Sequence, residues 1–125
     1  MELNERTIAG VTILDLKGRL TFTSGSDMGR RVQALLVGGT TQLLLNLEGV
    51  SYVDSAGLGA LVEAFTVSRH KAVRLKLLKP TERTRHLLEI TGLARIVESF
   101  DSESAAIASW LLVEDTHVAL SPSGA

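Results

Sequence analysis

The hydrophobic positions of the chain recur with a period of two in some segments and of about 3.6 in others, which predicts strands interspersed with helices. Residues 3–8 and 11–20 have the strand period, and Ala9-Gly10 between them suits a tight hairpin turn because glycine readily adopts a positive φ. In the second segment leucines occupy one face and charged residues the other. The chain is therefore expected to open with a β-hairpin that has one wetter face.

A first helix and a central strand follow the hairpin. Residues 24–29 are predicted to form a polar loop, after which apolar residues recur at helical spacing as far as Gly38-Gly39, where the helix ends. Residues 42–47 are apolar on both faces, as in a parallel strand buried in the middle of a sheet. From Leu58 onward the helical spacing returns, which predicts a second helix.

The alternation continues toward the C-terminus. Residues 73–77 predict a strand, and beyond Pro80 a third helix can be capped by Thr81 or Thr84. A short strand at 96–100 and a last helix complete the order β-β-α-β-α-β-α-β-α.

This order predicts an α/β fold, because strands that alternate with helices are joined by right-handed crossovers into a largely parallel sheet. The opening hairpin adds an antiparallel strand, so the sheet of about five strands should be mixed, with four helices. No internal repeat or linker divides the chain. We expect one domain at residues 1–112 and a flexible tail at 113–125.

Composition and charge narrow the function class. The 125 residues carry 13 lysines and arginines and 14 aspartates and glutamates, a formal net charge of −1. Cysteine is absent, which excludes disulfides, cysteine-ligated metals and thiol catalysis. Neither a run of about 18 apolar residues nor a secretory signal occurs, so we expect a cytoplasmic protein without a membrane-spanning segment.

Charge is distributed unevenly along the chain. The segment from Arg69 to Arg85 holds seven basic residues and one acid, Glu82. A solvated strand face with helix ends is one interpretation, and a basic surface for an acidic partner is the other. Nucleic acid is not an expected partner, because this segment contains no aromatic residue. The three histidines are scattered without metal-ligand spacing, so no metal site is expected.

The segment Val53-Asp-Ser-Ala-Gly-Leu-Gly59 is the candidate site, because α/β proteins bind their ligands at the carboxyl ends of strands. It fails as a dinucleotide fingerprint, since Val62 stands where the third glycine is required. It also fails as a hydrolase nucleophile elbow, since Val53 replaces the first glycine. A serine hydrolase would further need a histidine within hydrogen-bond reach of Ser55.

Ser55 is instead a candidate for modification by another protein. A serine at a helix N-terminus faces unpaired backbone N–H groups and the positive end of the helix dipole. These features can hold a phosphate without unfolding the domain. A purely structural interpretation stays open beside this one. Asp54 and Ser55 are ordinary N-cap residues, and Gly57 and Gly59 would let a helix pack closely against the sheet.

The six residues Asp54-Ser-Ala-Gly-Leu-Gly59, between the third strand and the second helix, resemble the signature of the STAS family, the anti-sigma factor antagonists. The approach from Leu43 to Val53 and the second strand from Val11 to Leu20 are also similar to that family. The order of elements agrees over about residues 1–112.

The resemblance implies a phosphoswitch, with no enzymatic activity and no cofactor in this chain. In the family, the serine at the position of Ser55 is phosphorylated by an anti-sigma factor that is itself a serine kinase. The unphosphorylated antagonist binds that kinase and frees the sigma factor. The phosphorylated form cannot hold the kinase, and a protein serine phosphatase resets the cycle. The ATP belongs to the kinase.

The resemblance also implies a partner-binding surface centred near Ser55. It would combine the motif with the loop after the second strand, which lies at the same edge of the sheet if the second and third strands run parallel. The residues expected there are Thr21, Phe22, Thr23, Ser24, Asp54, Ser55, Ala56, Gly57, Leu58 and Gly59. Thr21 stands where family members often have an aspartate, so the chain lacks that carboxylate for an ion pair with the partner.

Two other hypotheses predict different behaviour. A constitutive STAS scaffold or accessory subunit, in a stress-signalling or lipid-transport complex, would keep the same fold but bind its partner regardless of phosphate on Ser55. A small serine hydrolase would react at Ser55 with a fluorophosphonate probe. The failed elbow pattern argues against the hydrolase.

Overall fold

The computed structural model describes residues 1–111, and its elements follow the predicted order. The labelled elements are β1 (Glu2–Ile8), β2 (Val11–Leu20), α1 (Phe22–Val37), β3 (Gln42–Val53), α2 (Ser55–His70), β4 (Arg74–Leu78), α3 (Glu82–Ile90), the 3-10 turn η1 (Leu93–Arg95) and β5 (Ser99–Phe100). Residues 103–111 are also helical. The tail expected at 113–125 lies outside the described residues.

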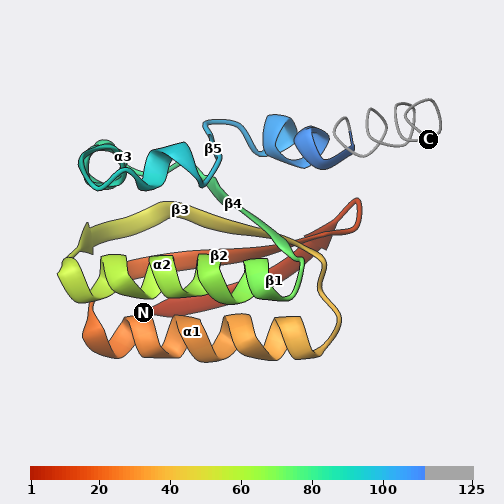
Figure 1. Ribbon diagram of the computed structural model, residues 1–125, viewed down its shortest axis with the longest axis horizontal. Helices are drawn as coiled ribbons and strands as arrows, with labels where there is room; N and C mark the ends of the chain where they lie inside the picture. The colour runs from red at the N-terminus through yellow and green to blue at the C-terminus, as the bar shows by residue number, and fades with distance from the viewer. Residues whose placement is uncertain (112–125) are drawn as a thin grey trace.

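Five strands form one mixed sheet in the order β1-β2-β3-β4-β5 (Figure 1). β1 and β2 pair antiparallel, and the other three pairs are parallel. The hairpin turns at Ala9 and Gly10, whose φ angles of 52° and 80° are both left-handed, the geometry that matches the twist of the strands it joins. The predicted fold class is therefore confirmed.

Helices cover both faces of the sheet. α1 and α2 lie side by side across one face, over a core built mainly from leucines and valines of β2, β3 and β4 (Figure 1). On the other face the helical residues 103–111 bury Ala106 and Trp110 against Ile13 and Leu44. The first half of β3 is covered on both sides, with Leu43 and Leu45 buried in one core and Leu44 in the other, which explains the run of apolar residues at 42–47.

α1 begins earlier than the sequence pattern predicts. The polar loop expected at 24–29 is wrong, because the helix starts at Phe22. Glycines and serines have low helix propensity, which produced that expectation. Gly25 is nevertheless required for packing, since a Cβ at this position would lie 2.8 Å from the Cβ of Ala60 on α2. The packing of α1 on α2 overrides the weak local preference.

The lengths of two strands also differ from the prediction. β3 was expected to end at residue 47, but it pairs with β2 as far as Leu20↔Val53 and so carries the chain directly to Asp54. β5 was expected at 96–100, but only Ser99 and Phe100 pair with β4. Of the two proposed caps for α3, Thr81 acts as the N-cap, accepting the N–H of Thr84 at 3.3 Å.

Candidate functional site

The serine of the motif stands at the first position of α2. Asp54 is the N-cap, and its Oδ1 accepts the N–H of Gly57 at 2.8 Å. Ser55 follows and is exposed. Within residues 1–111 the Ser55 hydroxyl makes no hydrogen bond. The helix start is thus capped by Asp54, which leaves the Ser55 hydroxyl accessible to a reacting group.

The start of α2 is held against the end of β2 by a glycine contact. A Cβ on Gly57 would lie 2.7 Å from the carbonyl carbon of Leu20 and closer still to its oxygen. The same carbonyl oxygen accepts the N–H of Asp54 at 3.3 Å. The glycine therefore has a structural role, because only a residue without a side chain allows this approach.

The start of α1 is fixed by its own cap. Thr21 is the N-cap, and its N–H donates to Ser24 Oγ at 2.8 Å. The Ser24 hydroxyl in turn donates to the carbonyl of Arg19 at 2.6 Å. Ser24 is 7% exposed, so its hydroxyl closes the turn between β2 and α1 rather than facing solvent. The side chain of Phe22, the first residue of α1, is 73% exposed.

The two segments named by the sequence meet at one edge of the sheet. β2 and β3 are parallel with Leu20 opposite Val53, so the N-termini of α1 and α2 follow neighbouring strand ends. We call the ten residues predicted to bind the partner the serine edge. Five of them are exposed: Phe22, Thr23, Ser55, Ala56 and Gly59. Thr21, Asp54 and Leu58 are half-buried, and Ser24 and Gly57 are buried. The buried pair supports the edge, and the other eight residues form its surface.

A groove of about 900 Å³ runs between α1 and α2 next to the serine edge. Its lining includes the small residues Gly25, Gly29, Ala56, Gly59, Ala60 and Ala64. Phe22, Arg30, Gln33 and Glu63 supply larger side chains to its lining. Small residues on both helices allow the close approach of α1 and α2, as at Gly25 and Ala60.

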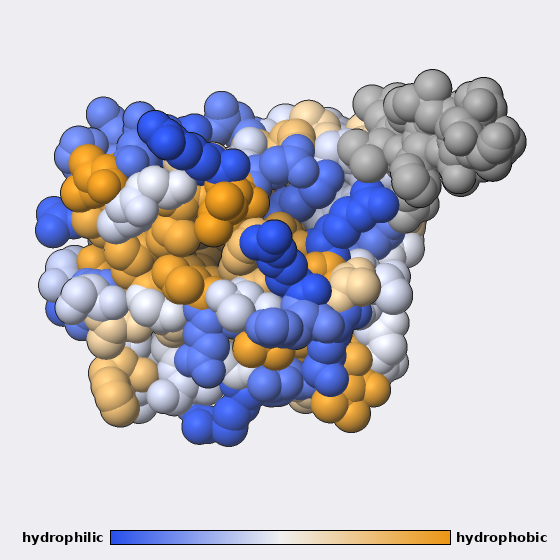
Figure 2. All heavy atoms as spheres, in the orientation of Figure 1, coloured by the Kyte–Doolittle hydropathy of each residue, from blue (hydrophilic) through white to orange (hydrophobic). Residues whose placement is uncertain are grey.

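Apolar side chains also gather between α2 and α3 in the space-filling view (Figure 2). The apolar residues of these two helices include the half-buried Leu58, Phe65 and Leu87, and Ile90 is 65% exposed. α2 thus has apolar surface on the side of α3 as well as on the side of α1. Such surface is typical of a region that binds another protein.

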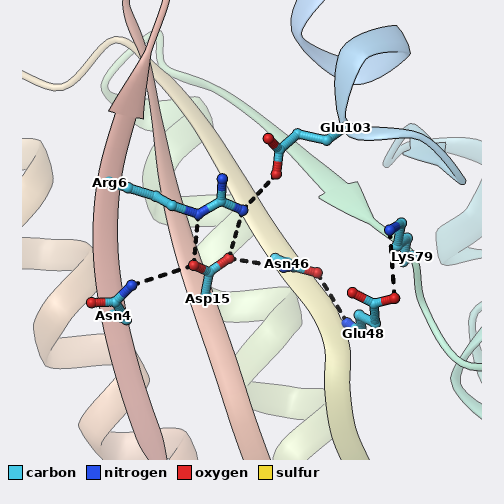
Figure 3. A network of polar contacts seen from close by, with 7 residues as sticks. All are labelled: Asn4, Arg6, Asp15, Asn46, Glu48, Lys79 and Glu103. Carbon is cyan, nitrogen blue, oxygen red and sulfur yellow. Dashed lines mark hydrogen bonds and ion pairs between the residues drawn. The ribbon is translucent and has the colours of Figure 1, made fainter.

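A polar network lies on the face of the sheet that the helical residues 103–111 cover (Figure 3). Arg6 on β1 pairs with Asp15 on β2 at 2.7 and 3.0 Å and with Glu103 at 2.5 Å. Asn46 on β3 donates to Asp15 at 2.8 Å. Hydrogen bonds from Arg6 lower the pKa of Asp15 and of Glu103. The network joins three strands to the helical residues 103–111, so its role is structural.

Lys76 on β4 is buried on the same face of the sheet as this network. Its side chain is 4% exposed, and Nζ donates to Ser109 Oγ at 2.7 Å and lies 3.4 Å from Glu98 Oε1. The ammonium also lies 4.6 Å from the ring centre of Trp110. This lysine belongs to the basic segment 69–85. Lys79 and Arg85 of that segment pair with Glu48 and Asp101, so the segment does not form one continuous basic surface.

Two kinds of catalytic group, a metal site and a histidine bonded to Ser55, are absent from residues 1–111. In residues 1–111 no group of three or more histidines and acids could hold a metal ion. No hydrogen bond joins Ser55 to His70 or His86, and His117 lies outside the described residues. The helices that the structure describes are all too short or too polar to cross a membrane.

The family of this chain follows from a comparison with models of known protein families. The model of the STAS domain matches residues 2–106, which is nearly the whole described chain. The chain belongs to the STAS family. The Ser55 motif and the edge it shares with the start of α1 are thus features of a STAS domain.

Relatives of this STAS domain include named regulators. The anti-sigma-B factor antagonist of Listeria monocytogenes is 32% identical over 98 residues, which cover 78% of this chain and 85% of the relative. A candidate anti-sigma factor antagonist from Thermotoga maritima has a crystal structure with a TM-score of 0.80 and 25% identity, covering 86% of this chain and 92% of that one. The phosphorylated form of SpoIIAA from Bacillus matches with a TM-score of 0.69 and 21% identity, over 86% and 98% of the two chains. At 21% identity, the match to SpoIIAA shows that the two chains share a fold.

Proposed function

We propose that this STAS domain is an anti-sigma factor antagonist that binds a serine-kinase anti-sigma factor while Ser55 is unphosphorylated. Phosphorylation of Ser55 by that kinase ends the complex, and a serine phosphatase restores the binding form. The observation that carries the proposal is the exposed, unbonded Ser55 hydroxyl at the start of α2, on the edge it shares with the start of α1. The names of the similar antagonists support it.

The helix start explains how a phosphate would be tolerated by the domain itself. The N–H of Gly57 is already bonded to Asp54, whereas the N–H groups of Ser55 and Ala56 have no acceptor within the helix. A phosphate on Ser55 would lie beside these amides and the positive end of the helix dipole. The fold is therefore expected to persist after modification.

The same phosphate would be unfavourable to a docked partner. It adds about −1.5 to −2 charges at pH 7, next to the carboxylate of Asp54. A partner that covers Ser55 would have to desolvate this charge, and every 1.4 kcal/mol of such cost is roughly a tenfold loss of affinity. Exposed Phe22 and the groove between α1 and α2 provide the apolar part of the proposed interface.

The proposal is tested by isolating the chain from its native cells and analysing it by mass spectrometry with its co-purified proteins. We expect a phosphate on Ser55 and an ATP-binding kinase that is retained mainly by the Ser55→Ala variant. Ser51→Ala, which removes another exposed serine outside the helix, is the matched control and should behave as wild type. An unmodified Ser55 with a set of partners that lacks a kinase would favour the constitutive scaffold instead.

A further inference from the structure

Two arginines from different elements lie over the only tyrosine of the chain. The guanidinium of Arg19 on β2 lies 4.6 Å from the ring centre of Tyr52 on β3, and that of Arg83 on α3 lies 5.8 Å from it. Arg19 and Tyr52 are direct partners in the sheet register. Tyr52 is half-buried, whereas both arginines are exposed. No sequence spacing links these residues, because the fold brings them together from three elements.

Neither arginine is neutralised within the described chain. Arg19 and Arg83 make no ion pair with any residue in 1–111, whereas Arg85, on the same helix as Arg83, pairs with Asp101 at 2.8 Å. Arg83 also occupies the first turn of α3, where the helix dipole disfavours a cation. The charge of Arg83 is therefore not placed to stabilise its own helix through the dipole.

The N–H donors of both arginines are available, because neither side chain makes a hydrogen bond with another residue in 1–111. A guanidinium can donate two parallel N–H bonds to the two oxygens of a carboxylate. Holding the side chains on the ring also reduces the conformational entropy that binding would cost. Tyrosine and arginine are the residue types that most often dominate the energy of protein interfaces.

The cluster borders the serine edge from the opposite face of the sheet. Leu20 and Val53 point into the core beneath α1 and α2, so the preceding residues Arg19 and Tyr52 point to the other face. Tyr52 is three positions before Ser55 in the chain. A partner that covers Ser55 could therefore reach the cluster around the ends of β2 and β3.

We propose that Arg19, Tyr52 and Arg83 form a binding site for an acidic segment of the protein partner, one that presents aspartate or glutamate side chains. This deepens the proposed function, because it names the chemistry of the partner surface beside the serine edge. The guanidinium groups of Arg19 and Arg83 have no acidic partner in residues 1–111, so a carboxylate is the group that complements them.

The test uses a fluorescein-labelled octaglutamate peptide and the full chain at low ionic strength. The chain has a net charge of −1, so binding of a polyanion requires a local basic site. We expect the peptide to bind, and to shift the NMR resonances of Arg19, Tyr52 and Arg83. The double variant Arg19→Gln/Arg83→Gln should bind about fivefold or more weakly, as expected for the loss of two exposed charge pairs.

Matched variants distinguish binding at this cluster from a general effect of positive charge. Arg69→Gln/Arg95→Gln removes the same charge from two other exposed arginines without ion pairs in the described residues, and should leave affinity unchanged. Tyr52→Phe keeps the ring and should bind as wild type, whereas Tyr52→Leu should weaken binding although no charge changes. Absence of binding by wild type, or an equal loss in the Arg69/Arg95 control, would overturn the inference. Because the peptide assay involves neither kinase nor phosphate, its failure is distinct from failure of the proposed switch.

Discussion

Gly57 on α2 lies directly against the carbonyl group of Leu20 at the end of β2, at a distance that a side chain cannot occupy. This contact positions the whole start of α2, including Ser55 two residues earlier, relative to the start of α1. The serine edge therefore depends on a glycine that takes no part in the proposed chemistry.

Replacing Gly57 by alanine should displace α2 and destabilise the domain. Overpacking of this kind costs about 1–3 kcal/mol, measured as the free energy of unfolding in urea. Gly59→Ala is the matched control, because a Cβ there meets nothing within 4 Å. That variant should be neutral or more stable by up to about 1 kcal/mol, since alanine is the better helix former. Equal stability of the Gly57 and Gly59 variants would contradict the close contact.

A negative charge at position 55 should stabilise the isolated domain even though it is proposed to weaken partner binding. α2 has no acidic residue in its first turn, so Ser55→Asp should raise the free energy of unfolding by about 0.3–1 kcal/mol through the helix dipole. The gain should shrink in high salt, because exposed charges are screened. Ser51→Asp, outside the helix, is the control and should show no gain. A destabilised Ser55→Asp would mean that the modification acts by disturbing the helix.

The hydrophobic pattern predicted the order of elements because each strand and helix buries one regular face. It failed at the start of α1, where the packing of Gly25 against Ala60 decides the structure and no local signal reveals it. The Asp54–Gly59 motif located the candidate site because all its residues are contiguous. The cluster of Arg19, Tyr52 and Arg83 could not be found in this way, since its members come from β2, β3 and α3.

The network around Arg6 predicts loss of stability in acid. Arg6 lowers the pKa of the Asp15 and Glu103 carboxyls in the folded state, below the values of about 3.9 and 4.3 expected when unfolded. The resulting stability is fully present above the unfolded pKa values, and it is lost as the pH falls through the folded ones.

Asp15→Asn tests this contribution. The variant should unfold more easily at pH 7, by about 1.5–3 kcal/mol for the lost charge-assisted hydrogen bonds. The difference from wild type should narrow as the pH falls below the unfolded value of about 3.9 and through the lowered folded pKa, because the wild-type carboxyl becomes protonated over that range. The measurement is urea unfolding at several pH values, with Glu63→Gln as the control for an exposed carboxylate that has no ion pair in residues 1–111. A difference that stays constant with pH would exclude the carboxyl group as its source.

The buried ammonium of Lys76 predicts a non-additive pair of substitutions. Ser109→Ala removes the hydroxyl that Lys76 Nζ contacts at 2.7 Å and should cost about 1–3 kcal/mol, because it deprives a buried cation of a hydrogen-bond partner. Lys76→Met should be neutral or stabilising, since an apolar side chain of similar length avoids burying the charge. In the Lys76→Met background Ser109→Ala should cost less by about 0.5 kcal/mol or more, as residues in contact couple. The four proteins are compared by urea unfolding followed by circular dichroism, and additive losses would show that Ser109 stabilises the helix at 103–111 independently of the lysine.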